Sequence, residues 1–411
     1  MSRPAGTPEA VITGIGVVAP TGIGAAAHWQ AVLDGKSGID RISRFDPSSY
    51  PVQLAGEITG FSAKDHVPGR LIPQMDLWTH MSLAAAQEAL DDAGLVPAEL
   101  TDYQMSVVTA SSSGGTEFGQ REMVRLYQEG PSRVGAYQSI AWFYAATTGQ
   151  LSIRHGMRGP SGVICTEQAG GLDSLGHARR LIRGGGTGLV LGGGLDASMC
   201  PYALTAQLTS RKLSVVDDPA RAYLPFDEAA SGYLPGEGGA IVLAENSQAA
   251  AARGARPYAV IAGYAAGFDP PPGSPRPPAL RRVIEAALAD AGLESSDIDV
   301  VFADGSGVPA EDRAEAQALC QVFGPRAVPV TVPKTLTGRL YGGGSALDAA
   351  TAALALRHGV IPQTSGVTRP VTADQLDLVL GAPRTRQLTS ALVVSRGYGG
   401  FASALVLRRA A

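Results

Sequence analysis

A helical pattern, a glycine stop, an apolar strand-like run and a Gly/Ser turn follow one another in this order twice along the 411-residue chain. The first copy covers residues 81–115 and the second covers residues 280–307. Alternating segments of this kind are typical of α/β proteins, and the recurrence of a whole set indicates an internal duplication. The sequence therefore predicts two related halves, residues 1–253 and 254–411, rather than two unrelated domains.

Composition excludes several other classes of protein. The formal net charge of −4 argues against a strongly basic nucleic-acid binder. Three cysteines, an odd number, do not make a disulfide framework and predict a cytoplasmic location. No segment reaches the roughly 18 apolar residues of a membrane-spanning helix. The sequence also has no Gly-x-x-x-x-Gly-Lys phosphate loop and no paired Cys or His motif for zinc, so no cofactor or metal is expected.

The segment GVICTEQAGG at residues 162–171 carries the most information about chemistry. An apolar run enters a sharp turn, and apolar residues at helical spacing follow over residues 172–182. A side chain at such a turn projects above the sheet beside the N–H groups of a helix N-terminus, which is a common position for a nucleophile. Gln168 stands at this turn, and an amide is not a nucleophile.

Together with this elbow, long motifs make the chain resemble the β-ketoacyl synthases of the thiolase superfamily. The closest resemblance is to the ketosynthase β subunits, or chain-length factors, of type II aromatic polyketide synthases. This resemblance implies a thiolase-like duplicated α/β fold with five layers, α-β-α-β-α. The motifs, in chain order, are VITGIGVVAP (11–20), SIAWFYAATTGQLSIRHGMRG (139–159), TEQAGGLDSLGHARR (166–180), RAYLPFDEAASGYLPGEGGA (221–240), VFADGSGVP (301–309) and VPKTLTGRLYGGG (332–344).

The resemblance also locates the catalytic positions. It implies that the nucleophilic cysteine and the two histidines of active ketosynthases correspond to Gln168, Asp304 and Arg339 here. A chain without these groups is expected not to condense acyl units. The resemblance implies instead a heterodimer with an active ketosynthase α subunit, in which this chain sets product length. An acyl carrier protein, through its phosphopantetheine arm, is expected to carry the substrate.

Enzymatic alternatives remain open at this stage. Gln168 is a candidate for decarboxylating a malonyl thioester on the acyl carrier protein to supply the starter unit, since decarboxylation needs oxyanion stabilisation more than a nucleophile. Cys165 is a candidate displaced nucleophile, although its apolar neighbours favour a buried, inert thiol. His155 and His177 are candidate bases; the arginines beside His177 are more typical of a surface or interface position.

A helix expected over residues 115–129 bears on product length. Thr116, Gly119 and Met123 recur at one helical face. The resemblance implies that this face lines the far end of the polyketide tunnel, where small side chains allow long products, here of the decaketide class. Gly119 has a second interpretation as a point of close helix packing. Tyr202 is a further candidate for the tunnel wall.

An aromatic cluster is formed by Tyr137, Trp142, Phe143 and Tyr144. Its simplest interpretations are core or subunit interface. Because ketosynthases dimerise, the resemblance implies that these four residues belong to the interface with the α subunit.

Overall fold

Two five-stranded arrays of the same design form the centre of the computed structural model, which describes residues 8–271 and 273–410. The first array consists of β1 (Ala10–Ala19), β5 (Met105–Ala110), β6 (Gly162–Ile164), β7 (Leu189–Asp196) and β8 (Gly238–Asn246). The second consists of β9 (Ala259–Phe268), β10 (Val300–Phe302), β11 (Pro329–Thr331), β15 (Ser390–Arg396) and β16 (Phe401–Arg409). Short strands are β2 (Gly22–Ile23), β3 (Ile39–Arg41), β4 (Leu54–Gly56), β12 (Val360–Ile361), β13 (Asp377–Leu378) and β14 (Arg384–Thr385).

The strand orders confirm the expected duplication. In space the first array has the order β6-β5-β7-β8-β1, and the second has β11-β10-β15-β16-β9. Numbered by chain position within each half, both orders are 3-2-4-5-1. The directions also agree: β5 is parallel to β6 and β7, as β10 is to β11 and β15, and the remaining pairs are antiparallel. The arrays join where β1 pairs with β9 at Val11↔Val260 and Ile12↔Ala259.

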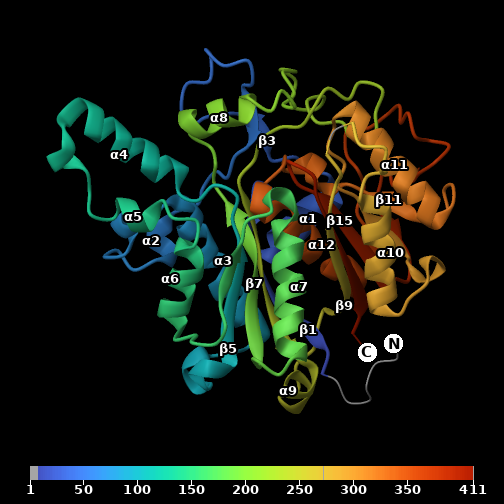
Figure 1. Cartoon of the computed structure of the whole chain (residues 1–411), viewed down its shortest axis with the longest axis horizontal. Coiled ribbons are helices and arrows are strands. Elements are labelled where there is room, and N and C mark those ends of the chain that lie inside the picture. Colours follow the sequence, from blue (N-terminus) through green and yellow to red (C-terminus); the bar gives the residue numbers. More distant parts are fainter. Residues whose placement is uncertain (1–7, 272, 411) are drawn as a thin grey trace.

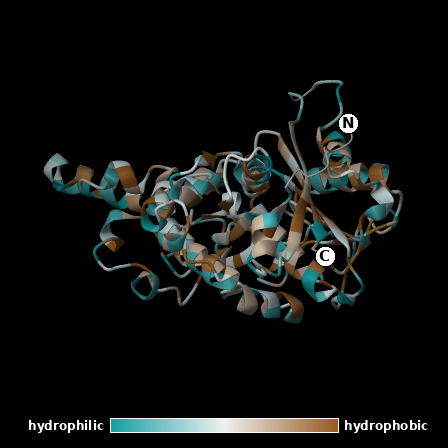
Figure 2. Ribbon diagram, turned by 90° about the horizontal axis from the view of Figure 1, so that it is seen from below, coloured by the Kyte–Doolittle hydropathy of each residue, from teal (hydrophilic) through white to brown (hydrophobic). Residues whose placement is uncertain are grey.

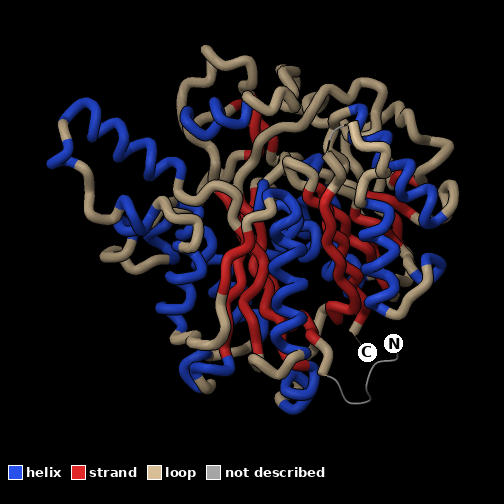
Figure 3. Tube along the Cα trace, viewed as in Figure 1, coloured by secondary structure: helices blue, strands red, loops and turns tan. Residues whose placement is uncertain are grey.

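Helices complete the expected five layers (Figures 1 and 3). Two central helices, α7 (Gly170–Arg183) and α12 (Gly344–His358), pack on each other and on strands of both arrays. One outer face carries α3 (Leu77–Ala93) and α6 (Ala146–His155), and the other carries α10 (Leu280–Ala291) and α11 (Pro309–Phe323). The remaining helices are α1 (Ala25–Asp34), α2 (Ala63–His66), α4 (Thr116–Glu129), α5 (Gln138–Ala141), α8 (Pro201–Leu208) and α9 (Ser247–Ala252).

The duplication extends to the contact between each first strand and its outer helix. A Cβ atom on Gly14 of β1 would lie 1.9 Å from the Ala89 carbonyl oxygen of α3. A Cβ atom on Gly263 of β9 would lie 2.3 Å from the Ala287 carbonyl oxygen of α10. Both distances are far shorter than van der Waals contact, so glycine lets the helix pack directly on the strand in each half.

Helix α4 projects from the body of the molecule as an arm, which is visible from two directions (Figures 1 and 2). Its base is held by Asp76, whose carboxylate accepts hydrogen bonds from the N–H groups of Phe118 at 2.7 Å and Trp78 at 3.3 Å. The second bond caps α3, which therefore starts at Leu77, earlier than the residue 81 expected from sequence. Within the described residues, no helix has the length and apolar character needed to cross a membrane.

Candidate functional site

The elbow lies between β6 and α7, as expected from the sequence. Strand β6 ends at Ile164, and a 3₁₀ turn over Glu167–Ala169 leads directly into α7. Glu167 has a φ of 53°, in the left-handed region that few residues other than glycine adopt. Such strain is typical of a turn that is held in place by its surroundings. The turn places Gln168 at the start of the central helix α7, where the residue is only 2% exposed.

Gln168 is held by hydrogen bonds within the protein through both its side chain and its main chain. With its amide oriented to satisfy both partners, the side chain accepts a hydrogen bond from the Tyr341 N–H at 3.1 Å and donates one to the Tyr341 carbonyl at 3.2 Å. The main-chain carbonyl of Gln168 accepts hydrogen bonds from the hydroxyls of Ser345 at 2.5 Å and Ser395 at 3.0 Å. The side-chain amide thus links the elbow to the loop before α12, with its oxygen and one of its two N–H donors bonded to the Tyr341 main chain.

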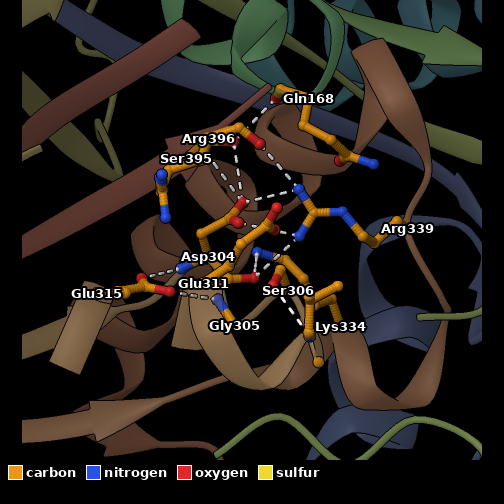
Figure 4. A network of polar contacts seen from close by, with 12 residues as sticks. Gln168, Asp304, Gly305, Ser306, Glu311, Glu315, Lys334, Arg339, Ser395 and Arg396 are labelled. Atoms are coloured by element: carbon orange, nitrogen blue, oxygen red, sulfur yellow. Dashed lines mark hydrogen bonds and ion pairs between the residues drawn. The ribbon is translucent and has the colours of Figure 1, made fainter. Parts of the chain in front are cut away.

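Asp304 and Arg339 form a buried ion pair with each other (Figure 4). The guanidinium is bidentate, with Nη1 3.0 Å from Oδ2 and Nη2 3.1 Å from Oδ1. Nη2 also donates to the Arg396 carbonyl at 2.9 Å. Asp304 is 1% exposed and Arg339 is 5% exposed. The two positions at which histidines were expected in an active ketosynthase therefore contain opposite charges that satisfy one another.

The topology explains why these residues meet. Strands β10 and β15 are parallel neighbours, so their carboxyl ends lie at the same edge of the array. Asp304 follows β10, and Arg396 is the last residue of β15; its N–H donates to the Asp304 carboxylate at 3.1 Å. Lys334 supports the same turn by donating to the carbonyls of Ala303 and Asp304 and by pairing with Asp348 at 2.7 Å.

Both members of the pair are ionised. Burial by itself would raise the pKa of Asp304, but the charges of Arg339 and Lys334 outweigh it and hold that pKa below its ordinary value. Burial opposes the charge of Arg339 as well, yet the Asp304 carboxylate keeps the pKa of the guanidinium well above its usual range. Behind Asp304, burial and the Asp304 charge raise the pKa of Glu315 to about 7.

Two carboxyl groups that no sequence motif marks, those of Glu315 and Glu167, also lie at this site. Glu315 accepts hydrogen bonds from the N–H groups of Asp304 at 2.7 Å and Gly305 at 2.9 Å. Glu167 accepts one from the Tyr398 N–H at 2.7 Å; burial raises the pKa of this carboxyl, opposed by Arg339. The only sequence feature that points to a role for Glu167 is its position immediately before Gln168. Glu315 lies within α11, and no sequence motif points to a role for it.

Cys165, His155 and His177 are the other candidate catalytic residues. Cys165 was expected to be buried; this is wrong, and the residue is exposed, because β6 is the edge strand of its array and ends one residue earlier. The pKa of its thiol is raised by partial desolvation and by Asp196, so the thiolate is disfavoured. Among the described residues lining the cavities beside the elbow, none is a histidine. His155 and His177 therefore lie away from both cavities.

A cavity of about 380 Å³ adjoins the elbow on the side of α4 and α8. Its wall includes Thr116 and Tyr202, two of the four residues expected to line the tunnel. Gly119 and Met123 are not part of this wall; Gly119 is buried and Met123 is partly buried further along α4. A second cavity, of about 400 Å³, lies on the other side of Glu167 and Tyr398 and reaches Arg339.

The aromatic cluster divides into two parts. Phe143 and Tyr144 are 52% and 45% exposed, and their ring centroids lie 4.7 Å apart. Tyr137 is 39% exposed, and Ile140, from the same segment, is 46% exposed. We call Tyr137, Ile140, Phe143 and Tyr144 the aromatic patch. Trp142 is only partly exposed and lines the cavity beside the elbow instead.

Family comparisons agree with these observations over most of the chain. The family described as "Beta-ketoacyl synthase, N-terminal domain" matches residues 8–249, and "Beta-ketoacyl synthase, C-terminal domain" matches residues 258–368. The actinorhodin polyketide putative beta-ketoacyl synthase 2 of Streptomyces coelicolor is 57% identical over 400 residues, which cover 97% of this chain and 98% of that protein.

Two further proteins are similar over nearly their whole length. The tetracenomycin polyketide synthase ketoacyl synthase beta subunit of Streptomyces glaucescens is 56% identical over 410 residues and covers 100% of both chains. The solved structure of the ishigamide ketosynthase/chain length factor has a TM-score of 0.89 at 28% identity and covers 98% of this chain and 100% of its own.

Proposed function

The chain belongs to the β-ketoacyl synthase family, and we propose that it is the chain-length factor of a type II polyketide synthase. In this role it pairs with an active ketosynthase α subunit and sets the length of the poly-β-ketone chain. The observation that carries the proposal is that the three positions which the resemblance assigns to catalytic groups hold side chains bonded within the protein, on an intact family fold. Gln168 bonds to the main chain of Tyr341, and Asp304 and Arg339 neutralise each other.

The names of the relatives support the same role. The protein from S. glaucescens is named as the beta subunit of a polyketide synthase, and the ishigamide structure as a ketosynthase with its chain length factor. We propose that the substrate reaches the heterodimer on the phosphopantetheine arm of an acyl carrier protein. This chain needs no cofactor of its own in this role. A cytoplasmic location is proposed as well, supported by three cysteines that are all free.

We further propose that the product is long, of the decaketide class. Thr116 borders the cavity of about 380 Å³ and leaves its α4 side open, because a threonine side chain fills far less volume than an aromatic one. A growing chain stops when its next two-carbon unit no longer fits the available space. The side chain at position 116 therefore acts as a steric limit.

Replacing Thr116 with phenylalanine is expected to shorten the dominant product. The added ring would occupy the cavity, and a misfit of a few carbon atoms is worth about 1–3 kcal/mol, a change of about tenfold or more in the ratio of long to short products. The measurement is mass spectrometry of products formed by the complex with its ketosynthase and carrier protein. Thr101→Phe, at an exposed site before β5, is the matched control. An unaltered product distribution would refute the steric limit.

The alternative function, decarboxylation of a malonyl thioester through Gln168, finds less support in the geometry. Both functional atoms of the Gln168 amide are bonded to the Tyr341 main chain. The neighbouring Asp304 carboxylate is paired with Arg339, which helps to hold the pKa of Asp304 below its ordinary value. A carboxylate accepts hydrogen bonds and cannot donate one to a developing enolate, and the neighbouring guanidinium is already bonded to that carboxylate.

Gln168→Ala distinguishes the two functions. We expect unchanged initiation and turnover in the assembled complex, together with a loss of about 1–3 kcal/mol in the free energy of unfolding, because the Tyr341 N–H and carbonyl lose their partners. Starter formation is followed with labelled malonyl carrier protein, and unfolding with urea. Gln317→Ala, on the exposed face of α11, controls for loss of a glutamine. A large fall in initiation with stability unchanged would establish the decarboxylase instead.

A further inference from the structure

Gly119 lies directly beneath the indole ring of Trp142. A Cβ atom on Gly119 would lie 2.6, 2.7 and 2.9 Å from the ring atoms Cε3, Cδ2 and Cζ3 of Trp142. Real Cβ atoms do not approach a ring so closely, so any residue other than glycine here requires the indole to move. The ring face, rather than a flexible side-chain end, makes the contact.

The main chain around Trp142 is held in place. The Gly115 N–H donates to the Trp142 carbonyl at 3.1 Å, and the Trp142 N–H donates to the Gln138 carbonyl at 3.4 Å. A Cβ atom on Gly114 would lie 2.2 Å from the Trp142 carbonyl oxygen, so the main chain at Gly114 already packs directly against the main chain at Trp142. A group added at position 119 is therefore accommodated by rotation of the indole about its own side-chain bonds.

Trp142 borders the cavity beside the elbow together with Thr116 and Tyr202, whereas Gly119 does not. The indole thus has α4 on one side and the cavity on another. The cavity wall is further fixed by Gln120, the residue next to Gly119, whose side-chain oxygen accepts a hydrogen bond from the Tyr202 N–H at 2.7 Å. Because the cavity is the open space that the ring borders, we expect a ring displaced from Gly119 to move into it.

We propose that residue 119 sets the depth of this cavity indirectly, by positioning Trp142. Trp142 is then a specificity-determining residue, because its ring borders the space in which the chain grows. Gly119 is a positioning residue that keeps the ring withdrawn. The inference rests on the proposed chain-length function and refines it: the small residue at position 119 provides space for an indole rather than for the substrate.

The proposal is tested by combining two substitutions in the complex with its ketosynthase and carrier protein. Gly119→Ala is expected to lower the ratio of long to short products by about tenfold, as expected when a few carbon atoms no longer fit. Trp142→Ala is expected to remove this dependence, so that the double variant gives the same products as Trp142→Ala alone. Trp142→Leu serves in the same way if the alanine variant does not fold. Gly149→Ala, within α6 and with open space around its Cβ position, is the matched glycine control.

The outcomes separate this inference from the function on which it rests. If Gly119→Ala shortens products equally with and without the indole, residue 119 acts directly and the inference is wrong. If Thr116→Phe shortens products while Gly119→Ala does not, the inference fails and the chain-length function stands. If neither substitution shortens the products, both the inference and the chain-length function fail.

A second readout does not depend on product formation. Trp29 and Trp78 are buried, so the difference in acrylamide quenching between complexes with Trp142 and with Trp142→Phe isolates this one indole. Gly119→Ala is expected to change that difference. An unchanged value would show that the ring has not moved, and would overturn the inference.

Discussion

Asp304→Ala is expected to lower the free energy of unfolding of the heterodimer by about 3–5 kcal/mol. The substitution leaves the Arg339 guanidinium buried without its bidentate carboxylate partner. The carbonyls of Arg396 and residue 304 and the ring of Tyr233 remain beside it. A buried charge without its counter-ion pays the full cost of desolvation. The expected loss is a large part of the stability of a typical domain, so the variant is expected to be recovered in reduced yield.

A second variant distinguishes the charge effect from the loss of a side chain. In Asp304→Ala/Arg339→Met both charges are removed and methionine keeps much of the arginine volume, so most of the lost stability is expected to return. Asp374→Ala, at an exposed position, is the control for removing an aspartate. All variants are compared by urea unfolding of the purified complex. A double variant less stable than Asp304→Ala alone would contradict the ion-pair explanation.

The sequence predicted the fold well because its strongest signal was a repeat. Matching helix ends at Gly94 and Gly292 reflect left-handed caps of α3 and α10, with φ values of 65° and 69°. These caps depend on local residues and are visible in sequence. Strand pairing is not local: the junction of the arrays, at Val11↔Val260, has no signature in either segment. The boundary between the halves at residues 253 and 254 remains a prediction.

The candidate site was predicted residue by residue but not as a network. Sequence motifs identified Asp304 and Arg339 as two separate losses of histidine. Their bidentate pairing depends on the edge shared by β10 and β15 and on the loop before α12, which no motif encodes. Likewise, helical spacing puts Gly119 on one face with Thr116 and Met123, and only the family resemblance relates that face to the tunnel. Its contact with Trp142 depends on the fold of the segment after α5.

A negative charge in the aromatic patch is expected to separate this chain from its ketosynthase partner. Phe143 and Tyr144 are about half exposed, and helix α6 presents Ile153 at 79% exposure shortly afterwards in the chain. A monomer rarely leaves aromatic side chains of this kind in water, and aromatic residues are enriched in the centres of protein interfaces. We therefore expect the patch to be covered in the heterodimer.

Phe143→Asp is expected to weaken the heterodimer about 100-fold, since loss of a central aromatic contact costs about 2–4 kcal/mol and the new carboxylate would be buried without a partner. Sedimentation of the mixed subunits measures the dissociation constant, and product formation is expected to fall with the population of heterodimer. Tyr103→Asp places the same charge at a 66% exposed aromatic before β5 and is expected to leave pairing intact. Circular dichroism verifies that both variants fold. Equal affinity of Phe143→Asp and Tyr103→Asp would exclude the aromatic patch from the subunit interface.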